Sequence, residues 1–127
     1  MSIYKRKDFS RWQARERLPD FLLCRAVREM QIGLVDASLG GLLFKKRIAS
    51  SGSGKSGGYR TLLSARLGER YVFLHGFAKG DKANVTQAEQ KALQLVGKVL
   101  VELSSQALAK AISCGVLEEV NCDQQVD

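Results

Sequence analysis

Positively charged side chains crowd one stretch of the chain, residues 42–84, where they could bind a phosphate backbone. Only Glu69 and Asp81 oppose them there. Arginine contacts phosphate bidentately, and neighbouring lysines depress one another's pKa, so that one lysine can move a proton near neutral pH. RNA cleavage by attack of a 2′-hydroxyl on the adjacent phosphate uses such cations to stabilise the developing charge. The cations are Lys45, Lys46, Arg47, Lys55, Arg60, Arg66, Arg70, Lys79 and Lys82.

Four of these cations, Arg60, Lys55, Lys79 and Lys82, could form one reactive centre if the strands that carry them lie together. The loop that holds Lys55, ASSGSGKS at 49–56, also matches a relaxed phosphate-loop pattern. A phosphate loop must open a helix, and here a strand pattern follows, so we do not expect a nucleotide site. The loop is either a plain hairpin connection or a flexible arm that delivers Lys55 to a phosphate.

The chain offers few other reactive groups. His75 is the only histidine, and alone it builds neither a metal site nor a histidine acid–base pair. Cys24, Cys114 and Cys122 are far apart and show no CxxC spacing. We therefore expect no metal, no cofactor, no disulfide framework and a reducing cytoplasm. Cys24 and Cys114 are expected to be small buried hydrophobic residues in helices.

Three strand patterns, at 42–49, 59–66 and 71–78, must position the cations. A Leu67-Gly68-Glu69 turn joins the last two, as in a short antiparallel meander. The third pattern carries large side chains on both faces, which is typical of a central strand. Residues 3–5 could add an edge strand.

Two amphipathic helices are expected before the strands. Asp8 is a suitable N-cap for the first helix, which runs to about Arg15. Pro19 interrupts the pattern, and the second helix begins after Asp20 and ends near Gly33. A pair of helices of this kind can cover one face of a sheet.

Two further helices are expected after the strands. Thr86 and Glu89 form a T-x-x-E capping box at the start of the third helix. Ser104 begins the fourth, over 106–113, and Gly115 closes it, while the acidic tail 118–127 is expected to fray. The predicted apolar face of the third helix consists of Ala88, Leu93, Val96, Leu100 and Leu103.

Composition indicates one domain, residues 1–127, with one modest core, since the chain is 45% hydrophobic. The net charge is +7, and the excess lies in the first half. Such a balance favours a polyanionic partner such as nucleic acid, although a basic surface also serves solubility. No signal-peptide or membrane-spanning pattern is present, so we expect a cytoplasmic protein without membrane contact.

Several segments resemble the HigB-like branch of the RelE/ParE toxin superfamily. They are FKKRIA, SGSGKSGGYRTLLSA and YVFLHGFAKGDKANVTQAE, and the similarity extends over roughly 3–120, with KSGGYR and GFAKxxxAN as its most specific parts. The resemblance implies the α+β, RelE-like microbial RNase fold, with two N-terminal helices packed on an antiparallel sheet and further helices at the C-terminus. It also implies the toxin of a type II toxin–antitoxin module, an mRNA interferase that cleaves mRNA on the ribosome without a metal and so inhibits translation.

By the same resemblance, Arg60 matches the active-site arginine of the family, and Lys79 and Lys55 are the other catalytic candidates. The implied partners are a cognate helix-turn-helix antitoxin, the ribosome and mRNA, with operator DNA reached only through the antitoxin complex. The expected substrate-binding residues are Lys45, Lys46, Arg47, Tyr59, Lys82 and His75.

Two other functions fit the same residues. One is a gyrase poison on the same fold, which the cationic loop and strands favour less than an RNA-directed toxin. The other is a non-catalytic nucleic-acid-binding module, whose binding would depend steeply on salt. Without the resemblance, the charge pattern alone would favour this binding module.

Overall fold

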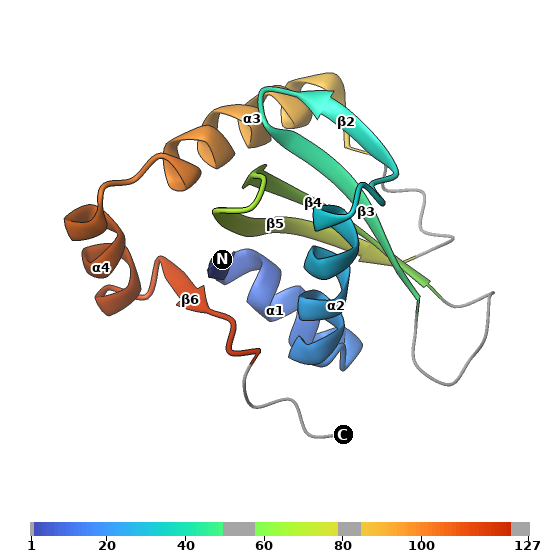
Figure 1. Cartoon of the computed structure of the whole chain (residues 1–127), viewed down its shortest axis with the longest axis horizontal. Coiled ribbons are helices and arrows are strands. Elements are labelled where there is room, and N and C mark those ends of the chain that lie inside the picture. Colours follow the sequence, from blue (N-terminus) through green and yellow to red (C-terminus); the bar gives the residue numbers. More distant parts are fainter. Residues whose placement is uncertain (1, 50–57, 79–84, 123–127) are drawn as a thin grey trace.

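The fold is of the α+β class, as the sequence predicts (Figure 1). The computed structural model describes residues 2–49, 58–78 and 85–122, which form four helices and a six-stranded sheet. Lys55, Lys79 and Lys82 lie outside the described residues. The elements are β1 (Ser2–Arg6), α1 (Lys7–Glu16), α2 (Asp20–Gln31), β2 (Ala37–Gly40), β3 (Leu43–Ala49), β4 (Gly58–Arg66), β5 (Arg70–Ala78), α3 (Gln87–Val101), α4 (Ser105–Ser113) and β6 (Leu117–Glu119).

The strand order is β2-β3-β4-β5-β1-β6, and β3, β4 and β5 form the predicted antiparallel meander. β1 lies between β5 and β6 and runs parallel to β5. Two predictions are therefore wrong: residues 3–5 do not form an edge strand, and the sheet is mixed rather than antiparallel. Ile3 and Tyr4 are buried in different core clusters, so this strand is apolar on both faces, which suits an internal position.

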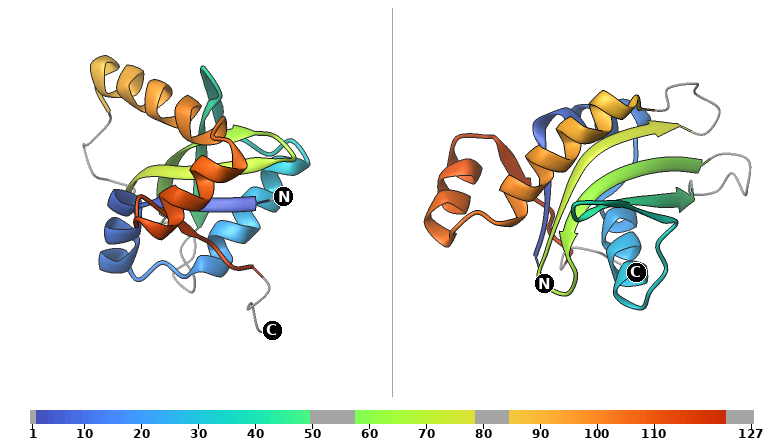
Figure 2. Two further views of the ribbon diagram at one scale, coloured as in Figure 1. Left: turned by 90° about the vertical axis from the view of Figure 1, so that its left-hand side faces the viewer. Right: turned by 90° about the horizontal axis from the view of Figure 1, so that it is seen from above.

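Helices cover both faces of the sheet (Figures 1 and 2). On one face, α1 and α2 pack through Phe9, Leu23 and Val27 against the side chains of β4 and β5. On the other face, α3 packs through Leu93 and Leu100. No helix in the described ranges is long and apolar enough to cross a membrane.

The contact between α3 and the sheet is unusually close at Gly97. A Cβ built on Gly97 would lie 1.8 Å from Ser64 Oγ, so only glycine fits at this point of the helix. The predicted apolar face of α3 is consequently only partly right. Leu93 and Leu100 are buried, whereas Val96 is 38% exposed, because the helix turns Gly97 toward the sheet.

Two of the three predicted helix caps are confirmed. Thr86 accepts a hydrogen bond from Glu89 N (3.1 Å) and donates its own backbone N–H to Glu89 Oε1 (2.8 Å), which holds the pKa of Glu89 below its ordinary value. Ser104 caps α4. Asp8 is not a cap, because β1 runs directly into α1 and Arg6 takes the N-cap position without a side-chain hydrogen bond. Asp8 instead lies in the first turn, where a carboxylate interacts favourably with the helix dipole.

The segment after α4 is ordered by pairing with β1. Residues of β6 form an antiparallel ladder with β1, and Val120 N donates to Ile3 O at 2.9 Å. The prediction that residues 118–127 fray is therefore wrong for 118–122, while 123–127 lie outside the described part. The acidic composition of the tail gave no indication that Val120, and Leu117 just before the tail, are buried.

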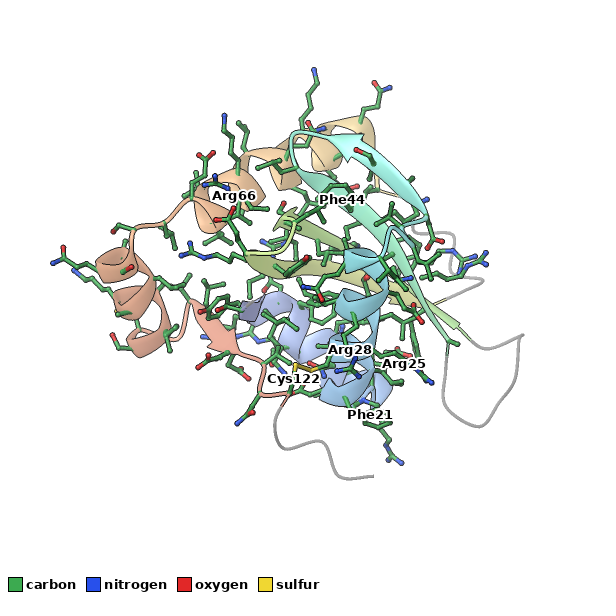
Figure 3. The ribbon with its side chains drawn as sticks, in the orientation of Figure 1. Phe21, Arg25, Arg28, Phe44, Arg66 and Cys122 are labelled. Atoms are coloured by element: carbon green, nitrogen blue, oxygen red, sulfur yellow. A yellow bond between two sulfur atoms is a disulfide. The ribbon has the colours of Figure 1, made fainter. Side chains whose placement is uncertain are left out.

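The cysteines also differ from the prediction. Cys24, on the buried side of α2, forms a disulfide with Cys122, which follows β6 (Figure 3). A sequence separation of 98 residues gives no local indication of this pairing. Cys114 is a free thiol, and it is exposed rather than buried.

Candidate nucleic-acid interface

Three cations lie on the α3 face of the sheet, close to the N-terminal end of β4. In the antiparallel ladders, Arg60 is paired with Arg47 of β3 and with Phe77 of β5. Lys45 is two residues before Arg47 and therefore points to the same face. Phe77 and Lys45 both line a hollow beneath the start of α3, which places this face on the α3 side. We call Lys45, Arg47 and Arg60 the cationic triad.

Arg60 is the most constrained member of the triad. Its side chain is partly buried, and its Nη1 atom is buried without a hydrogen-bond partner. Like charges directly opposite each other on two strands are destabilising, and Arg47 faces Arg60 in this way. None of the ion pairs within the described ranges involves the triad. An anion bound beside the triad would relieve this repulsion, and a shift of the Arg60 guanidinium toward the anion would give the unpartnered nitrogen an acceptor.

Two expected substrate-binding residues lie on the opposite face. Lys46 is 6% exposed, and its Nζ is 2.8 Å from Glu29 Oε1 of α2. The Tyr59 ring packs edge-on against Trp12, with 5.6 Å between centroids, and its hydroxyl donates to Glu16 O at 3.4 Å. The expectation that Lys46 and Tyr59 contact substrate together with Arg60 is thus corrected, because successive side chains of a strand point to opposite faces.

His75 lies beside the triad rather than in it. Its ring centroid is 6.0 Å from that of Phe77, the cross-strand neighbour of Arg60. Burial and, secondarily, the Arg6 guanidinium lower the pKa of His75 below its ordinary value of 6.5, so the imidazole is mostly neutral at pH 7. Residue His75 also borders a hollow of about 370 Å³ on the α1 side, with Asp8, Arg11, Trp12, Arg15, Leu74 and Gly76.

The remaining predicted cations belong to segments that lie outside the described residues. Lys55 belongs to the connection between β3 and β4, and Lys79 and Lys82 to the connection between β5 and α3. Both connections leave the sheet at the same end of the strands as Arg60. Ala49 is paired there with Gly58, and Tyr59 with Ala78. The described strand ends are thus adjacent, and the convergence of Lys55 and Lys79 on Arg60 stays a prediction.

One feature of this face could not be predicted from the charge pattern. A hollow of about 260 Å³, which we call the α3 hollow, opens between the sheet and the start of α3. No group of three or more metal-ligating side chains occurs in the part of the chain that the structure describes. The amphipathic pattern of α3 would have indicated only that this helix packs on a sheet. The residues that line the α3 hollow are Leu39, Lys45, Leu62, Phe77, Val85 and Gln90.

Comparison with known proteins identifies the family of the whole fold. The family model described as the RelE toxin of the RelE/RelB toxin–antitoxin system matches residues 1–120, which include every helix and strand of the fold. No curated protein matches the chain significantly. The match is to the RelE family as a whole, so the HigB-like branch stays a prediction. The chain therefore belongs to the RelE family of toxins, whose members act in toxin–antitoxin systems.

Proposed function

We propose that this RelE-family toxin is a ribosome-dependent endonuclease that cleaves mRNA without a metal and so arrests translation. The observation that carries the proposal is the unpartnered Nη1 of Arg60, whose cross-strand neighbours are Arg47 and Phe77. A buried donor without a partner costs on the order of 1–3 kcal/mol, and a shift of the Arg60 guanidinium onto a phosphate oxygen would recover this free energy. Arginine is the side chain best shaped to grip phosphate in this way.

The proposed chemistry is attack of the ribose 2′-oxygen on the adjacent phosphorus, with release of the 5′-oxygen of the next nucleotide. Arg60 stabilises the charge that develops on the phosphorane oxygens. Lys79 and Lys55 position the substrate, take the proton from the 2′-hydroxyl and deliver one to the leaving oxygen. Arg47, Lys45 and Lys82 hold neighbouring phosphates, and the ribosome aligns the mRNA for in-line attack.

The proposed partners follow from this role. RelE-family toxins pair with antitoxins. We propose that the antitoxin here is a helix-turn-helix protein encoded beside the toxin, that the complex reaches operator DNA only through that antitoxin, and that the toxin acts in the cytoplasm. A basic surface that binds mRNA on the ribosome is consistent with a net charge of +7.

Induced expression of substituted toxins tests the proposal. Arg60→Ala should reduce transcript cleavage by about a hundredfold or more, the usual effect of removing one charge-stabilising donor, and should abolish growth arrest. Arg60→Lys should restore little activity, because an ammonium lacks the planar fork of a guanidinium. Arg66→Ala is the matched control, since Arg66 is exposed at the opposite end of β4 (Figure 3).

Two readouts decide the outcome. Mapped 5′ ends of transcripts should appear within minutes of induction of the parent and of Arg66→Ala, but not of Arg60→Ala. Equal growth arrest by Arg60→Ala would show that the site is elsewhere. DNA double-strand breaks in place of cut transcripts would identify a gyrase poison instead.

A further inference from the structure

The Cys24–Cys122 disulfide joins the interior of α2 to the chain that follows β6 (Figure 3). Cys24 is 0% exposed and belongs to the core cluster between the sheet and the helices α1 and α2. Cys122 is only partly buried and packs against the same cluster. A reagent in solution can therefore approach the bond from the Cys122 side.

The strand before the disulfide is held by contacts that do not need this bond. β6 pairs with β1 over 117–119, and the N–H of Val120 donates to Ile3 O at 2.9 Å. The side chain of Val120 is 5% exposed, and a carboxylate oxygen of Glu118 lies 3.7 Å from Lys5 Nζ. These contacts should keep β6 on the sheet when the disulfide opens.

Most of the core is also independent of the disulfide. The second core cluster, between α3 and the sheet, lies on the opposite face from both cysteines. The bond nevertheless closes a loop of 98 residues, and closure of so long a loop removes much conformational entropy from the unfolded chain. Opening the disulfide should therefore lower the stability of the whole domain, while in the folded protein it loosens only the segment at Cys122.

A bond with these properties suits a compartment in which its redox state can change. In a cytoplasm, dithiol proteins keep accessible thiols reduced, and protein disulfides are usually transient or redox-sensing. A disulfide on which the fold depended would leave a toxin there unfolded. The Cys24–Cys122 bond can instead open and close in a protein that stays folded.

We propose that the Cys24–Cys122 disulfide is a reversible redox clasp rather than a permanent cross-link. A dithiol reductant opens the clasp and releases Cys122 from α2, and a peroxide closes it again. The inference rests on the proposed function only for the compartment in which the toxin acts. Since the closed form is the more stable one, the clasp makes the stability of the toxin rise with the level of oxidant.

Opening transfers two electrons and two protons from the reductant to the protein. A thiolate of the dithiol attacks Cys122 Sγ, the S–S bond breaks, and its electron pair passes to Cys24 Sγ, which takes up a proton. The second thiol of the reductant then attacks the reductant's own sulfur in the mixed disulfide. This step releases Cys122 as a thiol and leaves the reductant as a disulfide.

Closing uses hydrogen peroxide as the oxidant and releases two molecules of water. Peroxide converts the Cys122 thiol to a sulfenic acid and releases the first water. Cys24 Sγ then attacks the sulfenic sulfur, the S–O bond breaks, and the second water leaves as the disulfide forms again. Cys122 is the thiol that reacts with peroxide because it is the more exposed of the two.

Thermal unfolding of the purified full-length protein, with and without dithiothreitol, tests the clasp. Reduction should lower the Tm of the parent by about 10–20 °C and leave a single cooperative transition. Hydrogen peroxide, added after removal of dithiothreitol, should restore the higher Tm. Cys122→Ser should unfold near the Tm of the reduced parent and should not respond to dithiothreitol. Cys114→Ser removes an exposed free thiol and is the matched control, so it should keep the full shift.

Thiol labelling of the reduced, folded parent shows whether the end of the chain is released. Iodoacetamide should modify Cys122 about as fast as the exposed Cys114, and it should modify Cys24 much more slowly, because Cys24 lies in the core. Slow modification of Cys122, as slow as that of Cys24, would show that this segment stays on α2 and would contradict the release.

Thiol trapping in intact cells tests the clasp in its compartment. Cells are quenched with acid within minutes of induction, and the thiols are labelled with a maleimide that carries polyethylene glycol. Cys24 and Cys122 should be labelled in untreated cells and protected after a brief exposure to hydrogen peroxide, whereas Cys114 should be labelled in both.

Three results would overturn the inference: a disulfide that persists in untreated cells, thiols that stay reduced after peroxide, or a reduced protein without a cooperative transition. The last would show that the bond is part of the fold. None of these measurements uses transcript cleavage, so failure of the nuclease function and failure of the clasp are separate results.

Discussion

Replacement of Gly97 by alanine is a sharp test of how α3 is placed on the sheet. The new methyl carbon would lie 1.8 Å from Ser64 Oγ, 2.7 Å from Ser64 Cβ and 3.0 Å from Leu74 Cδ1. A normal contact needs well over 3 Å, so α3 must move away from β4. Overpacking of this kind costs about 1–3 kcal/mol, and a backbone shift places it at the upper end. The better helix propensity of alanine returns up to about 1 kcal/mol, so we expect a net loss of about 2 kcal/mol.

A double-mutant cycle separates this clash from other effects of the substitution. Ser64→Gly removes both of the closest atoms, so Gly97→Ala should be neutral or slightly stabilising in that background. The expected coupling free energy is about 2–3 kcal/mol, which is large for a contacting pair. Urea denaturation of the parent, the two single variants and the double variant measures this coupling free energy. A change of about 2 kcal/mol shifts the midpoint of unfolding by roughly 1 M, at a slope of about 1–3 kcal/mol per M. An equal cost of Gly97→Ala in both backgrounds would refute the close packing of α3 on Ser64.

Three further predictions concern groups whose roles depend on the tertiary structure. Cys122→Ser removes the Cys24–Cys122 disulfide, which closes a loop of 98 residues, and should destabilise the oxidised protein by up to about 4–5 kcal/mol in urea denaturation. Cys114→Ser, which removes only a free thiol, should change the stability little. Arg70→Met should cost roughly 2–3 kcal/mol in the same assay, because the guanidinium donates to three carbonyls at the C-terminal end of α3 at 2.9–3.2 Å. Folding lowers the pKa of His75, so the unfolded chain binds the imidazole proton more tightly than the folded protein does. The free energy of unfolding should therefore fall as the pH drops below 6.5. Thermal unfolding at a series of pH values should show this loss of stability in the parent and not in His75→Gln.

Short-range patterns were sufficient to predict much of the fold. Alternation and glycine placement predicted strands at 42–49, 59–66 and 71–78 and a turn between the last two, and the structure confirms them with bounds of 43–49, 58–66 and 70–78. The capping box at Thr86 is likewise local, since both of its partners lie within one turn of α3. The position of β1 was not predictable in this way, because its pairing with β5 joins residues that are far apart in the chain.

For the candidate site, residue types indicated a phosphate-binding surface, but they did not indicate which cations share a face. Lys45 and Arg47 lie with Arg60, whereas Lys46 points to α2 and pairs with Glu29. Successive side chains of a strand point to opposite faces, so Lys46 points away from the face that Lys45 and Arg47 share. This alternation could have been applied to the sequence. Which face remains open depends on where α1, α2 and α3 dock, and on the distant carboxylate that neutralises Lys46.

The amino-acid sequence by itself determined the local elements of this protein, its basic character and its resemblance to the RelE family, because these depend on neighbouring residues and on overall composition. The tertiary structure alone decided the internal position of β1, the pairing of Cys24 with Cys122, the unpartnered nitrogen of Arg60 and the hollow beside Gln90. Each of these features requires residues from distant segments to meet, and such meetings are fixed by the packing of whole helices and strands rather than by any short stretch of chain.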